Sequence, residues 1–411
     1  MSIESFLSIA AGAAGAAGAA GAAGAAGAAG AAGAAGAAGA AGAAGASGAA
    51  GAAGAAGASG SYAPMLSHGQ IIARDGIVGP FEGNVLTPTA LDATDIDNMA
   101  LWAPWVRAFV ISNDFLSRVG FQHYTAAAGS GLLAEPGIKV LHLEVREPGG
   151  GALPTATYKT LADMVRPSLS DFEDQLDLVE NYADLRGDRS PEILSQVGYP
   201  IDFFGSIVGL HPERNKKTIQ LIAIAQGIAS TVALRVKHAL ACKRPDAFSP
   251  QIMPSVPMPG HGALPSGHAT EAFTTAMVFA RLVSTVAGGD RLRLMLMRQA
   301  ARIAINRTVA GLHFPADSMA GAALGLALGD IIAARATGAN TIVETVSFDG
   351  RKVEREDFSV GQVWASDARA GFDVGGKTIV EVGHTTDLTI ANEDVSAPLK
   401  WLWDLASDEW S

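Results

Sequence analysis

The sequence has a single cysteine, Cys242, among its 411 residues. One thiol excludes an internal disulfide and fits a protein of a reducing compartment. The first ten residues also lack the basic cluster that begins a secretory signal, and they include Glu4. We therefore expect a cytoplasmic or otherwise soluble protein, in which Cys242 is a small buried thiol on a helix.

Positive charge is scarce as well. The chain has 29 Lys and Arg residues against 40 Asp and Glu residues, for a net charge of −11. Nucleic acid and anionic lipid attract basic surfaces, so this balance argues against both as partners. Any cations that matter for function must be gathered locally.

Long hydrophobic runs are also missing from the part that looks folded. Its longest uncharged run with helical character is Thr218–Leu234, and this run contains Gln220 and Gln226. A buried core helix has the same composition, so we expect no membrane span.

The N-terminal tract combines many glycines with an absence of proline. From Gly12 to Gly60 a glycine stands at every third position, separated almost only by alanine. Without proline a collagen triple helix is not expected, and as an α-helix each glycine would cost about 1 kcal/mol. Leu, Ile, Val and Phe are missing too, which disfavours a membrane helix. We predict a disordered, low-complexity arm, and a structural or assembly role through it remains an alternative function.

Helical periodicity dominates the middle of the chain. It begins near residue 158 and resumes at 267–284, 290–309 and 316–336. Apolar residues recur on one face of each segment, and charged residues interrupt them. This pattern predicts packed helices.

The last seventy residues change to a period of two. One hairpin is predicted about Asp349-Gly350 and another within 372–382. An aromatic tail follows, and we expect its tryptophans to dock on the helical body. The predicted division of the chain is a Gly-Ala arm at 1–61, an N-terminal region of unclear role at 62–140, a helical domain at 141–340, and a β-hairpin and aromatic tail at 341–411.

Two cations end one of the predicted helices. Lys237 and Arg244 are seven residues apart, which is two helical turns, so their side chains emerge from nearly the same face. Arg244 precedes Pro245, which disfavours a continuing helix. Both cations are therefore expected at a helix edge beside a loop.

A second group of polar residues opens the next helix. Ser266 can cap the helix or donate its hydroxyl, and Gly267 allows a ligand to approach the backbone N–H. His268 follows in the first turn. Helix N-termini attract anions, so this turn predicts an oxyanion site.

The third group places an imidazole before another helix. Arg307 precedes His313 by six residues, and Pro315 suits the first turn of the helix that follows. Asp317, one turn in, could hold one ring nitrogen of His313. An orienting carboxylate is what a nucleophilic or ligating imidazole needs.

Together the three groups resemble the signature of a known superfamily. The motifs are Lys-x6-Arg-Pro at 237–245, Pro-Ser-Gly-His at 265–268 and Arg-x5-His-x3-Asp at 307–317. In this order they closely resemble the superfamily that joins type 2 phosphatidic acid phosphatases, bacterial acid phosphatases and vanadium-dependent haloperoxidases. The third motif usually opens with Ser-Arg but here opens with Asn306-Arg307, and the arginine charge is kept.

The resemblance implies a fold and a binding site. The fold is an all-α helical bundle with the active site among the helices, to which the hairpins add a small C-terminal β appendage. The resemblance further implies that an oxyanion, phosphate or vanadate, is bound by Lys237, Arg244, Ser266, Gly267 and Arg307. Preorganised charge of this kind stabilises a trigonal-bipyramidal centre.

Two reactions share these residues. In a phosphatase, His313 attacks phosphorus to form a phosphohistidine, His268 protonates the leaving alcohol, Asp317 orients His313, and no cofactor is needed. In a haloperoxidase, vanadate is the cofactor, His313 is the axial ligand of vanadium, and His268 handles protons while hydrogen peroxide oxidises a halide.

The sequence favours the haloperoxidase interpretation. His261 lies seven residues before His268, where bromo- and iodoperoxidases resemble this sequence in having a histidine. It is a candidate for tuning halide or peroxide reactivity. The alternative is a phosphomonoesterase, since the short interval from Lys237 to Ser266 resembles the compact phosphatases. The partner is a small molecule in either case, and an oligomer is possible.

Overall fold

The structure is a computed structural model that describes residues 64–80, 89–129, 131–146, 153, 155–198, 200–284, 286, 288–338, 341–365 and 368–411. The chain divides into two compact units, Met1–Arg107 and Ala108–Ser411. The predicted Gly-Ala arm falls outside the described residues and stays a prediction, as does the four-part division of the chain. The first unit contains the helix α4 (Pro64–Ile77) and the 3-10 helix η1 (Ile96–Leu101), and α5 (Pro104–Leu116) begins in it.

The second unit is built on a six-stranded sheet. Its strands lie in the order β1-β2-β3-β4-β8-β7. All neighbours are antiparallel except β3 and β4, which are parallel. The bounds are β1 (Val119–Ala126), β2 (Glu135–Arg146), β3 (Thr155–Val165), β4 (Thr341–Asp349), β7 (Phe372–Val374) and β8 (Lys377–Ile390), and a separate pair is formed by β5 (Trp364–Ala365) and β6 (Ala368–Arg369).

The prediction of an all-α bundle with a small C-terminal β appendage is therefore wrong. Half of the large sheet comes from residues 119–165, a stretch that includes the start of the segment predicted as helical near residue 158. The strands of this region and those after residue 340 meet through the β3–β4 pair. Pairing between strands so distant in sequence leaves no trace in local periodicity.

One of the two predicted hairpins is also wrong. Asp349-Gly350 does not turn β4 back on itself, because β4 pairs with β3 and β8. The chain instead leaves the sheet in the 3-10 helix η5 (Gly350–Lys352), capped by the Asp349 side chain. The second hairpin is present, since β7 and β8 pair across Gly375-Gly376, both of which have positive φ.

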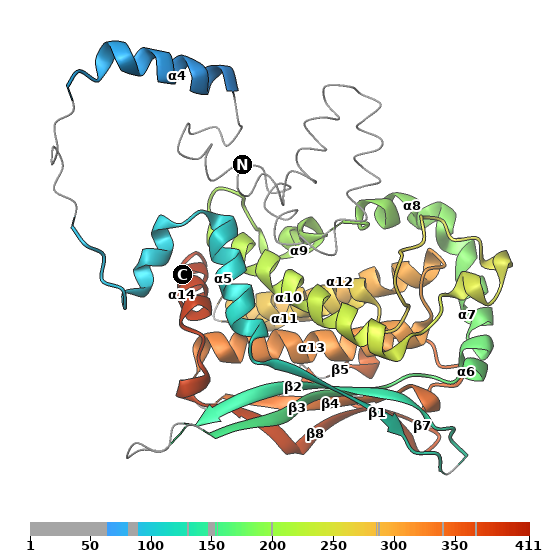
Figure 1. Cartoon of the computed structure of the whole chain (residues 1–411). Helices are drawn as coiled ribbons and strands as arrows, with labels where there is room; N and C mark the ends of the chain where they lie inside the picture. Colours follow the sequence, from blue (N-terminus) through green and yellow to red (C-terminus); the bar gives the residue numbers. More distant parts are fainter. Residues whose placement is uncertain are drawn as a thin grey trace. The chain divides into compact units, whose positions relative to one another are not determined.

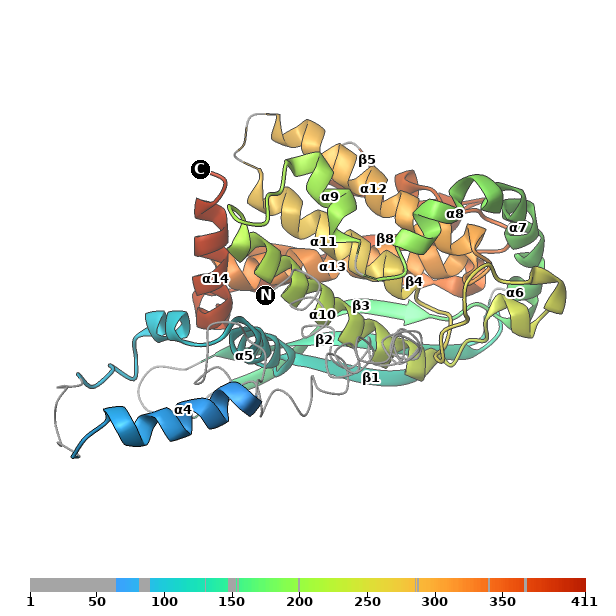
Figure 2. The same cartoon turned by 90° about the horizontal axis from the view of Figure 1, so that it is seen from above.

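Four long helices, α10 to α13, lie over the sheet (Figure 1). They pack against one another and, through α10 and α13, against β2 and β4. Seen from above, α14 stands at one end of this helical layer, where it contacts α10 and α13 (Figure 2). The helices of this unit after α5 are α6 (Leu169–Asp174), α7 (Leu176–Asn181), α8 (Arg186–Ser195), α9 (Ile201–Val208), α10 (Lys216–Leu240), α11 (Gly267–Leu282), α12 (Gly289–Val309), α13 (Pro315–Thr337) and α14 (Ala397–Asp408), with short 3-10 turns at η2 (Tyr182–Leu185), η3 (Pro245–Ala247), η4 (Pro250–Ile252), η6 (Val360–Gln362) and η7 (Asn392–Asp394).

Small residues allow α11 and α13 to approach each other closely. A Cβ atom added to Gly325 would lie 2.4 Å from the Thr270 carbonyl oxygen, and one added to Gly321 would lie 2.6 Å from the Ser266 carbonyl oxygen. Neither distance is compatible with a side chain at the glycine. The glycines thereby fix the start of α11 against the start of α13, where two of the three motifs meet.

The aromatic tail docks as predicted. Trp401 and Trp403 of α14 are 7% and 6% exposed. Trp410 donates its indole N–H to Thr218 Oγ1 at 2.9 Å, at the start of α10. The C-terminal helix thus stabilises the helical layer.

Two of the long helices qualify as membrane spans by length and hydropathy. They are Lys216–Ala247 and Pro315–Thr337, and 78% and 100% of their apolar windows are buried inside the fold. Core helices of soluble proteins meet the same criteria. The prediction of a soluble chain without a membrane span is therefore not confirmed by the structure.

Candidate active site

The first motif lies at the C-terminal end of α10. This helix ends at Leu240, and the capping residue Ala241 adopts a left-handed conformation with φ of 49°. Lys237, one turn earlier, is 2% exposed, and its Nζ donates to the carbonyl oxygens of Gly262 and Ala263 at 3.0 and 2.8 Å. These hydrogen bonds hold the loop of the second motif against the helix.

Arg244 connects the first motif with the third. It is 6% exposed and extended, as expected of a residue before proline. Its Nη1 donates to the Leu312 carbonyl oxygen at 2.8 Å and lies 3.0 Å from His313 Nε2. The guanidinium group is therefore in contact with the imidazole predicted to be the nucleophile or ligand.

The second motif forms the N-terminus of α11. Ser266 is fully buried and caps the helix, with its Oγ accepting from Ala269 N–H at 3.4 Å. Its own N–H donates to the Asp317 carbonyl oxygen at 2.8 Å. A Cβ atom at Gly267 would lie 3.8 Å from Lys237 Cε and fill the space beside the lysine side chain.

His313 is held in one orientation by Asp317. His313 Nδ1 lies 2.9 Å from Asp317 Oδ2, which also accepts the Phe314 N–H at 3.0 Å. A carboxylate only accepts hydrogen bonds, so this contact assigns the ring proton to Nδ1. His313 Nε2 then carries a lone pair beside Arg244.

Arg307 supplies the third cation from the end of α12. It is 1% exposed, and its Nη2 donates to the Ile193 carbonyl oxygen at 3.2 Å and to Gln196 Oε1 at 3.1 Å. Its Nε faces no hydrogen-bond acceptor among the described residues. A buried guanidinium with an unused donor fits an anionic ligand.

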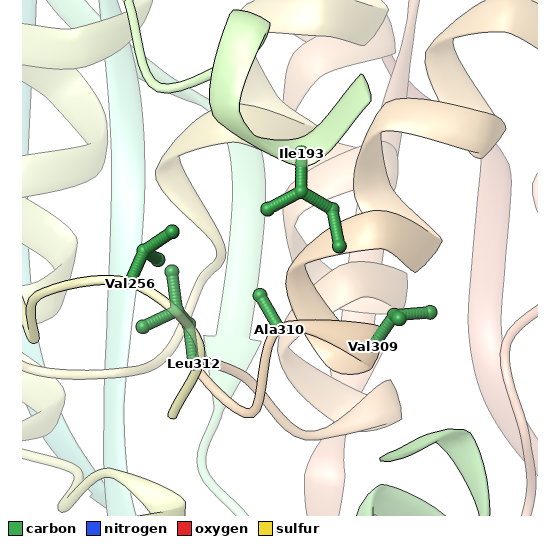
Figure 3. Packing of buried hydrophobic residues seen from close by; sticks show 5 residues of the cluster. All are labelled: Ile193, Val256, Val309, Ala310 and Leu312. Atoms are coloured by element: carbon green, nitrogen blue, oxygen red, sulfur yellow. The ribbon is translucent and has the colours of Figure 1, made fainter. Parts of the chain in front are cut away.

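A small hydrophobic cluster supports the loop between Arg307 and His313. Its members are Ile193, Val256, Val309, Ala310 and Leu312 (Figure 3). The loop turns at Gly311, which has φ of 77°. A Cβ atom there would lie 2.7 Å from Arg186 Nη2, so both the backbone and the packing require glycine.

Burial lowers the pKa values of the basic residues in the site. It lowers the pKa of Lys237 to about 7, with the Arg244 charge acting in the same direction. Burial also lowers the pKa values of Arg244 and Arg307 to about 10. The pKa of His313 is lowered well below its usual value by burial and then by Arg244 and Lys237, so the imidazole is neutral. An anion bound among these groups would relieve the cost of burying the cations.

His268 is engaged in a hydrogen bond to a backbone carbonyl. Its Nε2 lies 2.9 Å from the Gln196 oxygen, so Nε2–H donates to it. Burial and the Arg307 charge lower the pKa of His268 to about 3. The ring is therefore neutral and turned toward the chain that follows α8.

His261 lies beside Arg244. Its Nδ1 is 3.2 Å from Arg244 Nη2 and also 3.2 Å from the Gly262 carbonyl oxygen. Burial and then Lys237 lower the pKa of His261 to about 4. The structure thus brings all the residues named from the sequence into one region, with His261 at its exposed side.

Sequence reasoning missed several residues of this region. Gln196 is fully buried, and its Oε1 accepts from both Arg307 and Asn306. Its Nε2 donates to Glu192, which pairs with Arg302 through two oxygens. Glu192 belongs to α8 and Gln196 follows it, whereas Arg302 lies on α12, and no motif marked these three residues.

Glu271 was missed although its spacing gave a signal. It stands one turn after Gly267 on α11, so both share a helix face. Burial raises the pKa of Glu271 to about 7, while Ser230 and Lys237 lower it. The site therefore contains a carboxyl group close to its lysine.

Comparison with known proteins places the three motifs within one domain. Residues 217–339 match the family model of the PAP2 superfamily. Residues 10–65 match the collagen triple helix repeat, whose glycine at every third position the tract shares, although it has no proline before Pro64. The chain is 31% identical over 105 residues to decaprenylphosphoryl-5-phosphoribose phosphatase from two strains of Mycobacterium tuberculosis, CDC 1551 / Oshkosh and ATCC 25618 / H37Rv.

These matches cover part of each protein. They comprise 26% of this chain and 54% of the relatives, so the chain spans about half the length of the curated relatives it matches. A solved structure, the first transmembrane PAP2 type phosphatidylglycerolphosphate phosphatase from Bacillus subtilis, aligns with a TM-score of 0.27 and 19% identity over 39% of this chain and 82% of that chain. The family match and the three motifs within it lead to one conclusion: residues 217–339 are a PAP2 superfamily domain.

Proposed function

We propose that this domain hydrolyses a phosphate monoester through a phosphohistidine on His313. The observation that carries the proposal is the orientation of His313, whose Nδ1 is held by Asp317 at 2.9 Å while Nε2 lies 3.0 Å from Arg244 Nη1. The lone pair of Nε2 accepts from the Arg244 guanidinium, so it is directed to the side on which Arg244 would hold a phosphate. An imidazole in this state is a nucleophile.

The cations bind the phosphate and stabilise the transition state. Lys237, Arg244 and Arg307 are each buried, and a bound phosphate would keep Lys237, whose pKa is lowered to about 7, in its charged form. The Ser266 hydroxyl and the Gly267 N–H complete the binding site. Groups fixed in a site that excludes water need no reorganisation as charge develops on the phosphate oxygens. Attack by His313 forms the P–N bond as the P–O bond to the alcohol breaks.

His268 is the proposed proton carrier. It donates a proton to the leaving alkoxide and then takes one from the water that attacks the phosphohistidine. Its low pKa of about 3 is set by burial and by Arg307. A bound phosphate dianion offsets the Arg307 charge and raises the pKa, which makes the protonated ring accessible during the reaction.

The relatives support the phosphatase interpretation over the haloperoxidase interpretation that the sequence led us to favour. The curated relatives are phosphatases by name. Vanadate gains no support from these comparisons, so it is not part of the proposal. The name of the relatives contains a phosphoribose, and we propose a phosphate monoester of an organic alcohol as the substrate class.

The test is a parallel assay of the purified full chain. One arm measures release of phosphate from ribose 5-phosphate and p-nitrophenyl phosphate, and the other measures bromide oxidation with vanadate and peroxide. We expect hydrolysis in the first arm, its loss in His313→Ala, and an acid-labile phosphoenzyme trapped in the wild type. His238→Ala is the matched control, because His238 is exposed on the same helix as Lys237. Hydrolysis that survives in His313→Ala, or activity only in the bromide arm, would overturn the proposal.

A further inference from the structure

A cavity separate from the PAP2 motifs lies between the helical layer and the strands. It has a volume of about 210 Å³ and is bordered by α11, α12, α13, β4 and the β5–β6 pair. Among the residues of α11 that line the cavity, Met277 is the nearest in sequence to Gly267. The two are ten residues apart, which is about 15 Å along a helix. The cavity is therefore distinct from the candidate active site.

The cavity wall contains a buried hydrogen-bond donor, the indole N–H of Trp364. Trp364 is 6% exposed, and its Nε1 has no hydrogen-bond partner among the described residues. Indole nitrogen only donates, and a buried tryptophan N–H usually finds an acceptor. A ligand in the cavity would have to offer one.

The charges of the wall also favour an acceptor. Arg281, Arg293 and Arg369 line the cavity together with the carboxylates of Asp330 and Glu344. Asp330 faces two of these arginines, with Oδ1 2.6 Å from Arg281 Nη2 and Oδ2 3.5 Å from Arg369 Nη1. Its charge is thereby neutralised within the wall. Among the described residues of the wall three arginines face two carboxylates, and Arg293 also pairs with the exposed Asp290 outside the wall at 3.0 Å.

Apart from Ser284, the rest of the described wall is apolar. Met277 and Ala280 are 2% and 3% exposed, and the Trp364 ring lies with them along the cavity. The volume corresponds to roughly seven water molecules at about 30 Å³ each, which is more than a bare ion needs and less than a typical drug-sized site offers.

We propose that this cavity binds a small organic carboxylate. The carboxylate oxygens accept from Trp364 Nε1–H and from the arginines at the wall, and a short carbon body packs against Met277 and Ala280. The proposal is independent of the phosphatase activity, because none of these residues belongs to the three motifs.

Calorimetric titration of the full chain with succinate tests the proposal. We expect saturable binding in the wild type and a dissociation constant about tenfold higher in Trp364→Phe, which keeps the ring but removes one charge-assisted hydrogen bond. Arg293→Gln, a change at a partly exposed side chain, should weaken binding in the same direction. Trp403→Phe is the matched control, since Trp403 is equally buried but lies on α14.

The outcomes separate this cavity from the cationic active site. Succinate that binds with the same affinity to Trp364→Phe and to the wild type would be bound elsewhere, and the proposal would fail. It would also fail if millimolar succinate gave no saturable heat. Tighter binding of inorganic phosphate than of succinate, lost in Trp364→Phe, would replace the carboxylate with phosphate and so contradict the ligand class.

Discussion

At the residue scale, Asp317 contacts His313 and places a carboxyl group among buried cations. Its Oδ2 fixes the ring by accepting from Nδ1, and its negative charge lies among the cations Lys237 and Arg244. Burial raises the pKa of Asp317 to about 7, and the Lys237 charge and the Phe314 N–H oppose this rise. The hydrogen bond from His313 favours the carboxylate further.

Replacing Asp317 with asparagine should remove the negative charge beside His313. The Oδ2 atom accepts from both His313 Nδ1 and the Phe314 N–H, so the amide oxygen would take its position, and the imidazole would lose the carboxylate that stabilises positive charge on it. We expect kcat for phosphomonoester hydrolysis to fall by about 10²–10⁴, the usual contribution of a general acid or base system. The measurement is steady-state kinetics, with the melting temperature recorded in parallel. An unchanged kcat would show that the charge of Asp317 does not assist His313.

The side chain of Gln196 is a second point at which the proposed activity should depend on the position of a binding group. It accepts from Arg307 Nη2 at 3.1 Å and from Asn306 Nδ2 at 3.0 Å, so it holds the guanidinium toward the site. Gln196→Ala should lower kcat/KM by about 10–100-fold, because small displacements of a binding group cost this much.

Arg302→Gln provides the graded control for Gln196. Arg302 pairs with Glu192, which accepts from Gln196, but its own side chain is 44% exposed. An exposed ion pair contributes about 0–1 kcal/mol, so the expected loss is less than tenfold. Equal losses in the two variants would contradict a specific role for Gln196.

The residues of the candidate site were predictable to different degrees. Lys237, Arg244, Arg307 and His313 stand at fixed spacings within recognisable motifs. Gln196 follows a short helix more than a hundred residues before Arg307. Only the folded chain brings it to the site, so periodicity and spacing could not reveal it.

At the scale of helices and strands, the candidate site depends on the contact between α11 and α13. The glycines of α13 allow the backbone of α11 to pack directly against it, and the Ser266 N–H reaches the Asp317 carbonyl oxygen at 2.8 Å. The first turns of the two helices are thereby joined. The second and third motifs keep their relative positions because no side chain lies between the two helices at these glycines.

Gly325→Ala should destabilise the protein even though alanine is the better helix former. The added Cβ would lie 2.4 Å from the Thr270 carbonyl oxygen, and overpacking of this kind costs about 1–3 kcal/mol. Gly187→Ala in α8 is the matched control, since nothing lies within 4 Å of its Cβ, and it should be neutral or stabilising by up to about 1 kcal/mol. Denaturant unfolding measures both. Equal stability of the two variants would exclude close packing at Gly325.

Sequence periodicity located the long helices well and the sheet poorly. Helices predicted at 267–284, 290–309 and 316–336 are present as α11, α12 and α13, because their apolar positions repeat within a single segment. Pro136 and Gly137 interrupt the alternating pattern of the strand β2. This strand pairs antiparallel with β1 on one side and β3 on the other. Its identity as a strand depends on neighbours that a local pattern does not contain.

At the scale of the whole molecule, one buried histidine of the sheet should make the stability of the folded chain depend on pH. His142 of β2 is 1% exposed, and neither ring nitrogen has a hydrogen-bond partner among the described residues. Burial lowers the pKa of His142 to about 4, and the charge of Arg335 acts in the same direction. Asp394 opposes the shift, whereas Arg118 and Arg146 add to it.

The stability of the folded chain should therefore fall with pH in a window set by His142. The unfolded chain binds a proton near pH 6.5 and the folded chain only near pH 4, so the unfolded state holds more protons between these values. The contribution to stability is complete above pH 6.5 and is lost as pH falls toward 4. Other buried groups shift in both directions, so the comparison must be made against a variant without this histidine.

His142→Leu isolates the effect, because leucine does not titrate. Relative to this variant, the wild type should lose about 1–3 kcal/mol of unfolding free energy between pH 6.5 and pH 4, and the difference between the two should be constant above pH 7. Urea unfolding at half-unit pH intervals gives both curves. Parallel curves through the whole window would mean that His142 takes up its proton without cost in the folded sheet, and a difference that grows above pH 7 would assign the pH dependence to another group.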